Sequence, residues 1–342
     1  MEVKHNIPTG SLELKEVIEK KGTKMTFRPD IKVMDCTLRD GGLINNFRFS
    51  DQLVKSLYQA CIDSGVDYME LGYKSSKKIF SISDFGSLKF CSEEDISRII
   101  GDNISSNLKL SVMADTGRTD YHEDIPKKSE SIIDMIRVAA YAHQIPAAIE
   151  IIKDAHDKGY ETTINIMAVS NVMESELNEA LEILSLTEVN IIYLVDSFGA
   201  FYSEEIRDLA YKYLSYARDA GKKIGIHTHN NQQLAYANTL EALILGVSYL
   251  DATFSGLGRG AGNCPIELLL GFLKNPKYNL RPVLKFIQEY INPLKEELSW
   301  GFDIPYMLTG QLNVHPKSAM CFLDSNDKKN LIKFYDYLTE EG

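Results

Sequence analysis

The chain has 342 residues, of which 44% are hydrophobic and 25% are charged, a composition typical of an ordinary globular protein. Its 37 basic residues are outnumbered by 48 acidic ones, which gives a formal net charge of −11. This balance argues against a general nucleic-acid-binding or anionic-membrane surface, although it leaves room for a local positive pocket.

Five cysteines are scattered along the chain without a CxxC pair: Cys36, Cys61, Cys91, Cys264 and Cys321. Because an odd number cannot form a complete disulfide framework, they indicate a reducing compartment. The N-terminal residues lack the apolar core of a signal peptide, and no stretch approaches the roughly 18 apolar residues of a membrane span. We therefore expect a cytoplasmic protein without membrane segments.

Short apolar or β-branched runs recur along the chain, and a stretch with helical spacing follows each one. The runs are IKVMDC (31–36), DYMELGY (67–73), LKLSVMA (108–114), IDMIRVA (133–139), ETTINIMAV (161–169), VNIIYLVD (189–196), KKIGIHTH (222–229) and VSYLDATF (247–254). Strand–helix alternation predicts right-handed βαβ units and a parallel sheet. Eight units fit a closed (β/α)₈ TIM barrel of the α/β class. An open doubly wound sheet is the alternative, but its usual GxGxxG turn is absent after the first run.

Helix ends can be recognised between several of the runs. Ser50 is suited to cap a helix that stops near Gly65. Pro146 suits a first helical turn, and Gly159 is placed to end that helix. Gly246 has the same terminating role after ANTLEALIL. These signals support the alternating pattern.

Three segments follow from this pattern. Residues 31–275 are predicted to form the TIM-barrel catalytic domain. Residues 1–30 are polar with weak periodicity and are predicted to be an N-terminal extension outside the barrel. Residues 276–342 have helical spacing and are predicted to form a small C-terminal helical appendage.

Two histidines stand at the end of the seventh run, where a barrel gathers its functional groups. His227 and His229 are two residues apart on a predicted strand, so both side chains point to one face. Two neutral imidazoles there can bind one divalent ion. The alternative is that one of them is simply a hydrogen-bonded core residue.

A carboxylate to complete such a site is available after the first run. Asp40 lies there, and the first and seventh strands of a closed barrel are separated only by the eighth. Strand parity leaves open whether Asp40 or Asp35 faces the ion. Arg39 beside it offers a planar fork for a substrate carboxylate or a developing oxyanion. The alternative for Arg39 is a structural ion pair with Asp40.

Other run ends carry weaker signals. Ser197 follows the sixth run and can donate to a substrate oxygen, although turn chemistry explains it equally well. The eighth run leads into SGLGRGAGN, whose alternating glycines before Asn263 allow close backbone approach or an anion nest. Glu70, in the second run, is expected to pair with Arg39 or a group of the metal site.

These motifs together resemble one known superfamily. DCTLRDGG, MELGY, VDSFGA, HTHNN and SGLGRGAGN occur in the order and spacing of the DRE-TIM metallolyases, which include hydroxymethylglutaryl-CoA lyase and isopropylmalate synthase. The resemblance covers about residues 31–275 and is strongest to the 4-hydroxy-2-oxovalerate aldolase branch, through VDSFGA and GRGAGNCPIE.

The resemblance implies a metal site and a reaction. The residues that would hold the divalent ion, Mn²⁺ or Mg²⁺, are Asp40, His227, His229 and Asn263. Arg39 would stabilise a pyruvate enolate, and Ser197 would bind the pyruvoyl carboxylate. The ion would serve as electron sink while a general base removes the 4-hydroxyl proton of a 4-hydroxy-2-oxo acid.

The chain departs from the family at the general base. The aldolases place a histidine two residues after the RDG glycine, and this chain has Leu43 there. Tyr306 and His315 in the C-terminal segment are the main candidates for the missing catalytic role, with His122 as a third. Each of them can equally be structural.

The expected activity is therefore that of a metal-dependent carbon–carbon lyase or aldolase acting on a small 2-oxo acid and an aldehyde. A Claisen-type acyl-CoA condensing synthase of the same superfamily is one alternative. A catalytically degenerate metal-binding barrel is another, because of Leu43. A homodimer is the default assembly. The aldehyde dehydrogenase partner of the aldolase branch is doubtful, because residues 276–342 diverge.

Overall fold

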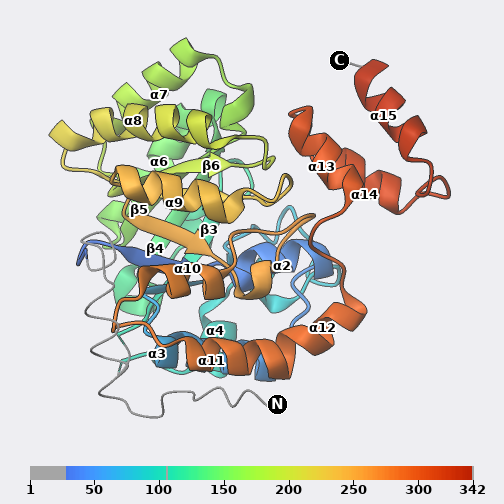
Figure 1. The fold of residues 1–342 in the computed structure, drawn as a ribbon. Coiled ribbons are helices and arrows are strands. Elements are labelled where there is room, and N and C mark those ends of the chain that lie inside the picture. The colour runs from blue at the N-terminus through green and yellow to red at the C-terminus, as the bar shows by residue number, and fades with distance from the viewer. Residues whose placement is uncertain (1–27, 105–106, 341–342) are drawn as a thin grey trace, which may run out of the picture.

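The computed structural model describes residues 28–104 and 107–340, and within them eight parallel strands close into a barrel in chain order (Figure 1). The strands are β1 (Lys32–Asp35), β2 (Tyr68–Tyr73), β3 (Lys109–Asp115), β4 (Met135–Tyr141), β5 (Glu161–Met167), β6 (Ile191–Asp196), β7 (Lys223–Thr228) and β8 (Tyr249–Ala252). Each overlaps one of the eight predicted runs. The barrel closes where β1 pairs with β8, from Lys32 beside Tyr249 to Asp35 beside Ala252.

Helices follow the strands and cover the outside of the barrel. They are α2 (Thr37–Asn45), α3 (Asp51–Ser64), α4 (Glu93–Ile100), α5 (Tyr121–Asp124), α6 (Ile145–Asp157), α7 (Glu174–Ser185), α8 (Ser203–Asp219), α9 (Ala235–Leu245) and α10 (Ile266–Leu273). The predicted ends are confirmed. Ser50 Oγ accepts the Leu53 N–H at 3.2 Å, and Gly65 and Gly246 follow their helices with φ of 75° and 124°.

The Arg-Asp-Gly-Gly sequence after β1 does not form an open turn. It lies inside the short helix α2. Its glycines are required by packing rather than by flexibility. A Cβ on Gly41 would lie 2.9 Å from the Leu257 side chain, and one on Gly42 would collide with the Phe47 ring. Gly41 therefore lets α2 lie close to the loop that follows β8, and Gly42 leaves room for the Phe47 ring.

The core has two parts, divided by the sheet. Residues that face outward on the strands, such as Val33 and Ile192, pack against the helices. Residues of the opposite parity, such as Met34, Met135 and Tyr193, fill the barrel interior. The interior also contains charged side chains, which connect to the site described below.

Beyond α10 the chain is helical, which confirms the predicted class of a (β/α)₈ barrel with C-terminal helices. The elements are α11 (Leu280–Phe286), the π-helical turn η6 (Ile287–Ile291), α12 (Asn292–Glu297), α13 (Ile304–Gln311), α14 (Lys317–Leu323) and α15 (Leu331–Glu340). Helix α11 packs beside α3, whereas α14 and α15 extend away from the barrel (Figure 1). A small separate core that includes Phe322 and Phe334 joins them.

Most of the predicted N-terminal extension, residues 1–27, lies outside the described residues. None of the helices in the described part of the chain combines the length and the apolar character needed to cross a bilayer. The three segment boundaries stay predictions from the sequence.

Candidate active site

Three side chains predicted as metal ligands meet at the rim of the barrel where the strands end. Asp40 comes from α2, His227 from β7 and His229 from the residue just beyond β7. The Nε2 atoms of His227 and His229 lie 3.8 and 3.9 Å from Asp40 Oδ2, and all three side chains are buried. Strand β8 pairs with both β1 and β7, and so brings the two ends of the barrel together.

This triad fits a divalent cation. The distances of 3.8 and 3.9 Å from the two Nε2 atoms to Asp40 Oδ2 are within the roughly 4.2 Å that two bonds of about 2.1 Å to one ion can span. His227 Nε2 is buried and has no hydrogen-bond partner among the described residues, so its lone pair is available. The donor set of two imidazoles and a carboxylate suits Mn²⁺ and its neighbours better than Mg²⁺, which prefers oxygen.

Asn263, the fourth predicted ligand, lies beside the triad in a different orientation. Its amide nitrogen donates to Asp40 Oδ2 and to the Leu257 carbonyl, while its buried Oδ1 has no partner among the described residues. A ligand role therefore requires the amide to turn over. Gly258 permits this close approach, because a Cβ there would lie 2.9 Å from Asp40 Oδ2.

A chain of buried ions fixes the triad from inside the barrel. His227 Nδ1 lies 3.0 Å from Asp251 Oδ2, which accepts a hydrogen bond of 2.6 Å from Arg137 Nη2. Arg137 Nη1 and Arg39 Nε both donate to Glu70 Oε2, at 2.9 and 2.8 Å. The expected partnership of Glu70 with Arg39 is thus present, and the network runs from the His227 imidazole to the Arg39 guanidinium.

The same network sets the protonation states that a metal requires. Burial alone would raise the pKa of Asp40, but Arg39 and the two imidazoles outweigh it and hold that pKa well below its usual range. Burial would likewise raise the pKa of Asp251, yet Arg137 brings it to about 2. Burial lowers the pKa of His229 to about 3. At neutral pH the carboxylates are therefore ionised and His229 is neutral.

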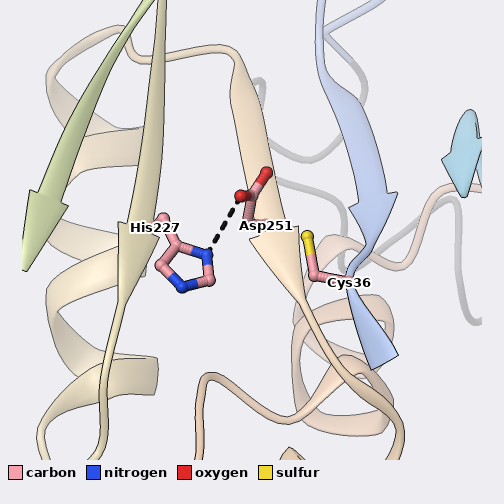
Figure 2. Close-up of side chains that lie close together, drawn as sticks. All are labelled: Cys36, His227 and Asp251. Atoms are coloured by element: carbon pink, nitrogen blue, oxygen red, sulfur yellow. Dashed lines mark hydrogen bonds and ion pairs between the residues drawn. The ribbon is translucent and has the colours of Figure 1, made fainter. Parts of the chain in front are cut away.

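A second cluster with metal-ligand chemistry shares His227 but is closed to a cation. Figure 2 shows Cys36, His227 and Asp251 side by side in the barrel interior. Arg137 occupies this place, with Nη2 at 2.6 Å from Asp251 Oδ2 and Nη1 at 3.4 Å from Cys36 Sγ. Burial and the Asp251 charge raise the pKa of the Cys36 thiol well above its ordinary value. The cluster therefore orients His227.

A cavity of about 280 Å³ lies where β2, β3, β4 and β5 end, and Leu43 of α2 and Arg259 of the loop after β8 form part of its wall. Residues that give it its chemistry are Leu43, Tyr73, Lys89, Asp115, Arg259 and His315. Leu43 is three residues beyond Asp40 on α2, which places the wall of the cavity next to the ion site. A substrate held at the triad would extend into this space.

The two C-terminal candidates take different positions. His315 lines the cavity, and its Nδ1 accepts the Lys317 N–H at 3.0 Å, so in the neutral ring Nε2 carries the hydrogen and can donate. The Tyr306 ring packs against Gly260 in the loop after β8. The Tyr306 carbonyl accepts from Asn231 Nδ2 at 3.1 Å, which docks α13 on the loop after β7.

Ser197 and His122 are not among the described residues that line this cavity. Ser197 Oγ accepts the Ala168 N–H at 2.8 Å, which leaves its own hydroxyl hydrogen free to donate. The His122 ring is 70% exposed on α5 and faces Asp154 at 3.4 Å.

Sequence reasoning missed several groups in the cavity wall. Asp115 is the last residue of β3, immediately after the third predicted run, so its place at a strand end was a readable signal. Lys89 lies in the 3₁₀ turn η1 (Ser87–Lys89) between β2 and α4, where no pattern marks it. Arg259 was passed over inside the glycine-rich loop.

Comparison with known proteins assigns this architecture to a family. A family model described as HMGL-like matches residues 30–288. The chain belongs to the HMGL-like family. The predicted membership of the DRE-TIM superfamily is confirmed, because this model covers most of the chain and the motifs that carry the resemblance.

Curated relatives of this HMGL-like protein are lyases. An oxaloacetate decarboxylase of Mycobacterium tuberculosis is 30% identical over 244 residues, which cover 71% of this chain and 69% of the relative. A 4-hydroxy-2-oxovalerate aldolase of Thermus thermophilus is 27% identical over 282 residues, covering 79% and 77%. A solved N-terminal domain of a putative aldolase from Bacteroides vulgatus matches with a TM-score of 0.74 and 28% identity, covering 89% of this chain and 100% of that one.

These relatives support an enzyme that is a carbon–carbon lyase and that uses a divalent metal, as HMGL-like aldolases do. The chain has the residues to hold such an ion.

Proposed function

We propose that this protein cleaves or forms a carbon–carbon bond of a 4-hydroxy-2-oxo acid through the enolate of pyruvate, with Mn²⁺ at Asp40, His227 and His229. The observation that carries the proposal is the buried triad, in which His227 Nε2 has no partner among the described residues, near the cavity that Leu43 and Arg259 line. A divalent cation at this triad would supply a sink for the negative charge that develops on the 2-oxo group.

Arg39 has the geometry of an oxyanion-stabilising group. Glu70 and Asp40 fix it on two sides, at 2.8 Å from its Nε and 3.2 Å from its Nη1. A guanidinium held this firmly needs little reorganisation when charge builds up on the enolate oxygen. Ser197, through its free hydroxyl hydrogen, would donate to the pyruvoyl carboxylate, and His315 through Nε2 would donate to the departing carbonyl oxygen.

Asp115 is the carboxylate best placed to act as the base. It lines the cavity, and its closest cation is Arg118, at 3.9 Å. Burial raises the pKa of Asp115 against the opposing effect of Lys89 and Arg118, which moves the group toward the range where a base works near neutral pH. This role replaces the histidine that Leu43 displaces.

Protons and electron pairs balance in the proposed cleavage. The 4-hydroxyl proton passes to the Asp115 carboxylate, the C3–C4 bond breaks, and its electron pair enters the enolate of pyruvate. The former carbinol carbon leaves as a carbonyl compound. The proton taken up by Asp115 then passes to C3 of the enolate, directly or through solvent, which completes pyruvate and restores the carboxylate. The condensation reaction follows the same steps in reverse.

Decarboxylation of a 3-carboxy-2-oxo acid is a second candidate. It yields the same enolate without removal of a hydroxyl proton, and Leu43 at the position of the family's histidine favours a reaction that needs no such base. The similarity to an oxaloacetate decarboxylase supports it as well.

The test is pyruvate release, measured with lactate dehydrogenase, from a 4-hydroxy-2-oxo acid and from oxaloacetate. Solvent deuterium exchange into the methyl group of pyruvate is followed in parallel. We expect metal-dependent exchange, and cleavage that chelation abolishes and Mn²⁺ restores. Cleavage should fall in Asp115→Asn, whereas decarboxylation should not. Metal-loaded protein that neither exchanges pyruvate nor releases it would refute the proposal, and free CoA from acetyl-CoA would support a condensing synthase instead.

A further inference from the structure

Lys89 is a buried cation without an acceptor. Its side chain is only 6% exposed, and its Nζ lies 4.2 Å from the ring centroid of Phe80 and 4.7 Å from that of Tyr73. Phe47 and Phe85 complete the set of rings around it. Aromatic faces attract an ammonium but accept none of its three hydrogens in the way an oxygen does. Within residues 28–104 and 107–340, no carboxylate or carbonyl bonds to this ammonium.

Lys89 lines the cavity that Leu43 and Arg259 also line, and the charges nearest to it differ from those nearest to Asp40 of the triad. The charges that act on Lys89 are those of Asp115 and Arg118. Those that act on Asp40 come from Arg39, Arg259 and the two imidazoles. Both Lys89 and Arg118 line the cavity. The cations that line the cavity are therefore of two kinds: Arg259, whose charge acts on Asp40 of the triad, and Lys89 and Arg118, which follow β2 and β3 along the chain.

We propose that Lys89 and Arg118 form a subsite for an anionic group on the aldehyde-derived half of the substrate. The enzyme would thus act on a 4-hydroxy-2-oxo acid that carries a second acidic group, a carboxylate or a phosphate, on or next to C4. This inference rests on the proposed function and specifies its substrate class.

The position of Asp115 supports this assignment. Asp115 lines the cavity together with both cations, and Arg118 Nη1 lies 3.9 Å from its Oδ2, so a 4-hydroxyl group at Asp115 places substituents of C4 near Lys89 and Arg118. An uncharged half would leave the buried ammonium without an acceptor, whereas an ionised group would satisfy it.

The experiment uses the Mn²⁺-loaded full chain in the condensation direction, with pyruvate and three aldehydes of similar size. Glyoxylate carries a carboxylate, glycolaldehyde phosphate carries a phosphate, and acetaldehyde carries no charge. We expect kcat/KM for one of the two anionic aldehydes to exceed that for acetaldehyde by about 100-fold, as for a site that pairs a buried ion. Which of the two is preferred identifies the anionic group.

Lys89→Met keeps the apolar stem among the aromatic rings and removes the charge. It should reduce the ratio of the two kcat/KM values from about 100 toward 1, while Lys89→Arg should retain most of the preference. Lys77→Met is the matched control, because Lys77 also lies over a ring, that of Phe90, but is not among the described residues that line the cavity. It should leave the ratio unchanged.

The outcomes separate the two proposals. Pyruvate deuterium exchange without a preference for an anionic aldehyde would overturn the subsite and leave the proposed function intact. Absence of exchange would overturn the proposed function. In that case calorimetric binding of glutarate, compared with butyrate, decides the subsite. Tighter binding of glutarate that Lys89→Met abolishes would support it, and equal binding of the two acids would overturn it.

Discussion

His227 stands between two clusters that offer a cation similar atoms, yet only one is open to it. On its Nε2 side lie Asp40 and His229, and the nitrogen has no partner among the described residues. On its Nδ1 side lie Asp251 and Cys36, together with the guanidinium of Arg137. The contrast between the two clusters shows that closely spaced ligand atoms do not suffice for a metal site. A protein cation that already neutralises the carboxylate closes the site.

The placement of Arg39 and Arg137 explains how the His227 ring can take part in both clusters. Arg39 lies 3.2 Å from Asp40 Oδ1 and leaves Oδ2 toward the imidazoles. Arg137 instead bonds the same oxygen, Asp251 Oδ2, that faces the His227 ring. The paired side can therefore hold the ring in the tautomer with hydrogen on Nδ1, which leaves the Nε2 lone pair for an ion.

The largest effect on metal binding is expected from a substitution in the open cluster, formed by Asp40, His227 and His229. Asp40→Asn should abolish stoichiometric Mn²⁺ binding and reduce pyruvate deuterium exchange by far more than the roughly 100-fold that loss of an outer partner costs. Cys36→Ala, on the closed side, should retain one ion per chain. Metal content after dialysis and the exchange rate measure both variants. Loss of the ion from Cys36→Ala but not from Asp40→Asn would reverse the assignment of the two clusters.

Arg137→Met tests what closes the second cluster. The substitution leaves Glu70 and Asp251 buried without their shared cation, so the free energy of unfolding should fall by about 3–5 kcal/mol. Urea denaturation of metal-free protein measures this change. The matched control is Arg207→Met, which removes an ion pair of 2.7 Å from a half-exposed arginine and should cost no more than about 1 kcal/mol. Equal losses in the two variants would show that the Arg137 network does not stabilise the barrel.

Asp35 differs from the carboxylates of both clusters, because it is buried and no cation pairs with it among the described residues. Burial, opposed only weakly by hydrogen bonds from Thr37, raises the pKa of Asp35 to about 7. The folded state therefore binds this proton more tightly than the unfolded state does. The resulting stability is fully present below pH 4 and is lost as the pH rises through about 7.

Asp35→Asn should remove this dependence. The asparagine oxygen can still accept from Thr37, so the metal-free variant should gain about 4 kcal/mol over the parent protein between pH 4 and pH 8. Urea unfolding at several pH values gives the difference curve. Asp102→Asn, at an exposed position, is the control, and its difference in unfolding free energy from the parent protein should not change with pH. A flat curve for Asp35→Asn as well would show that Asp35 is already ionised in the fold.

The sequence predicted the barrel and the open cluster for a physical reason. Strand period and helix caps are local, and the rule that strand ends converge brought Asp40, His227 and His229 to one rim. The closed cluster was harder to foresee. Arg137, inside the apolar run IDMIRVA, signalled a buried charge that needs partners, but which carboxylates pair with it depends on barrel register. Lys89 lies in a turn whose packing no local pattern encodes.

Asp251→Asn tests how far the closed side controls the open one. Asparagine can still accept the Nδ1 hydrogen of His227, so the ring should stay in place, but the ring loses the negative charge that increases the basicity of Nε2. Mn²⁺ affinity should fall by about 10- to 100-fold, with one ion still bound at saturation. A competition titration against a chelator measures it. Asp134→Asn, just before β4 at the opposite rim, removes a carboxylate far from the triad and should leave the affinity unchanged. An unchanged affinity in Asp251→Asn would mean that Arg137 and Asp251 hold the barrel together without tuning the ion, whereas a loss of all binding would make Asp251 part of the metal site itself.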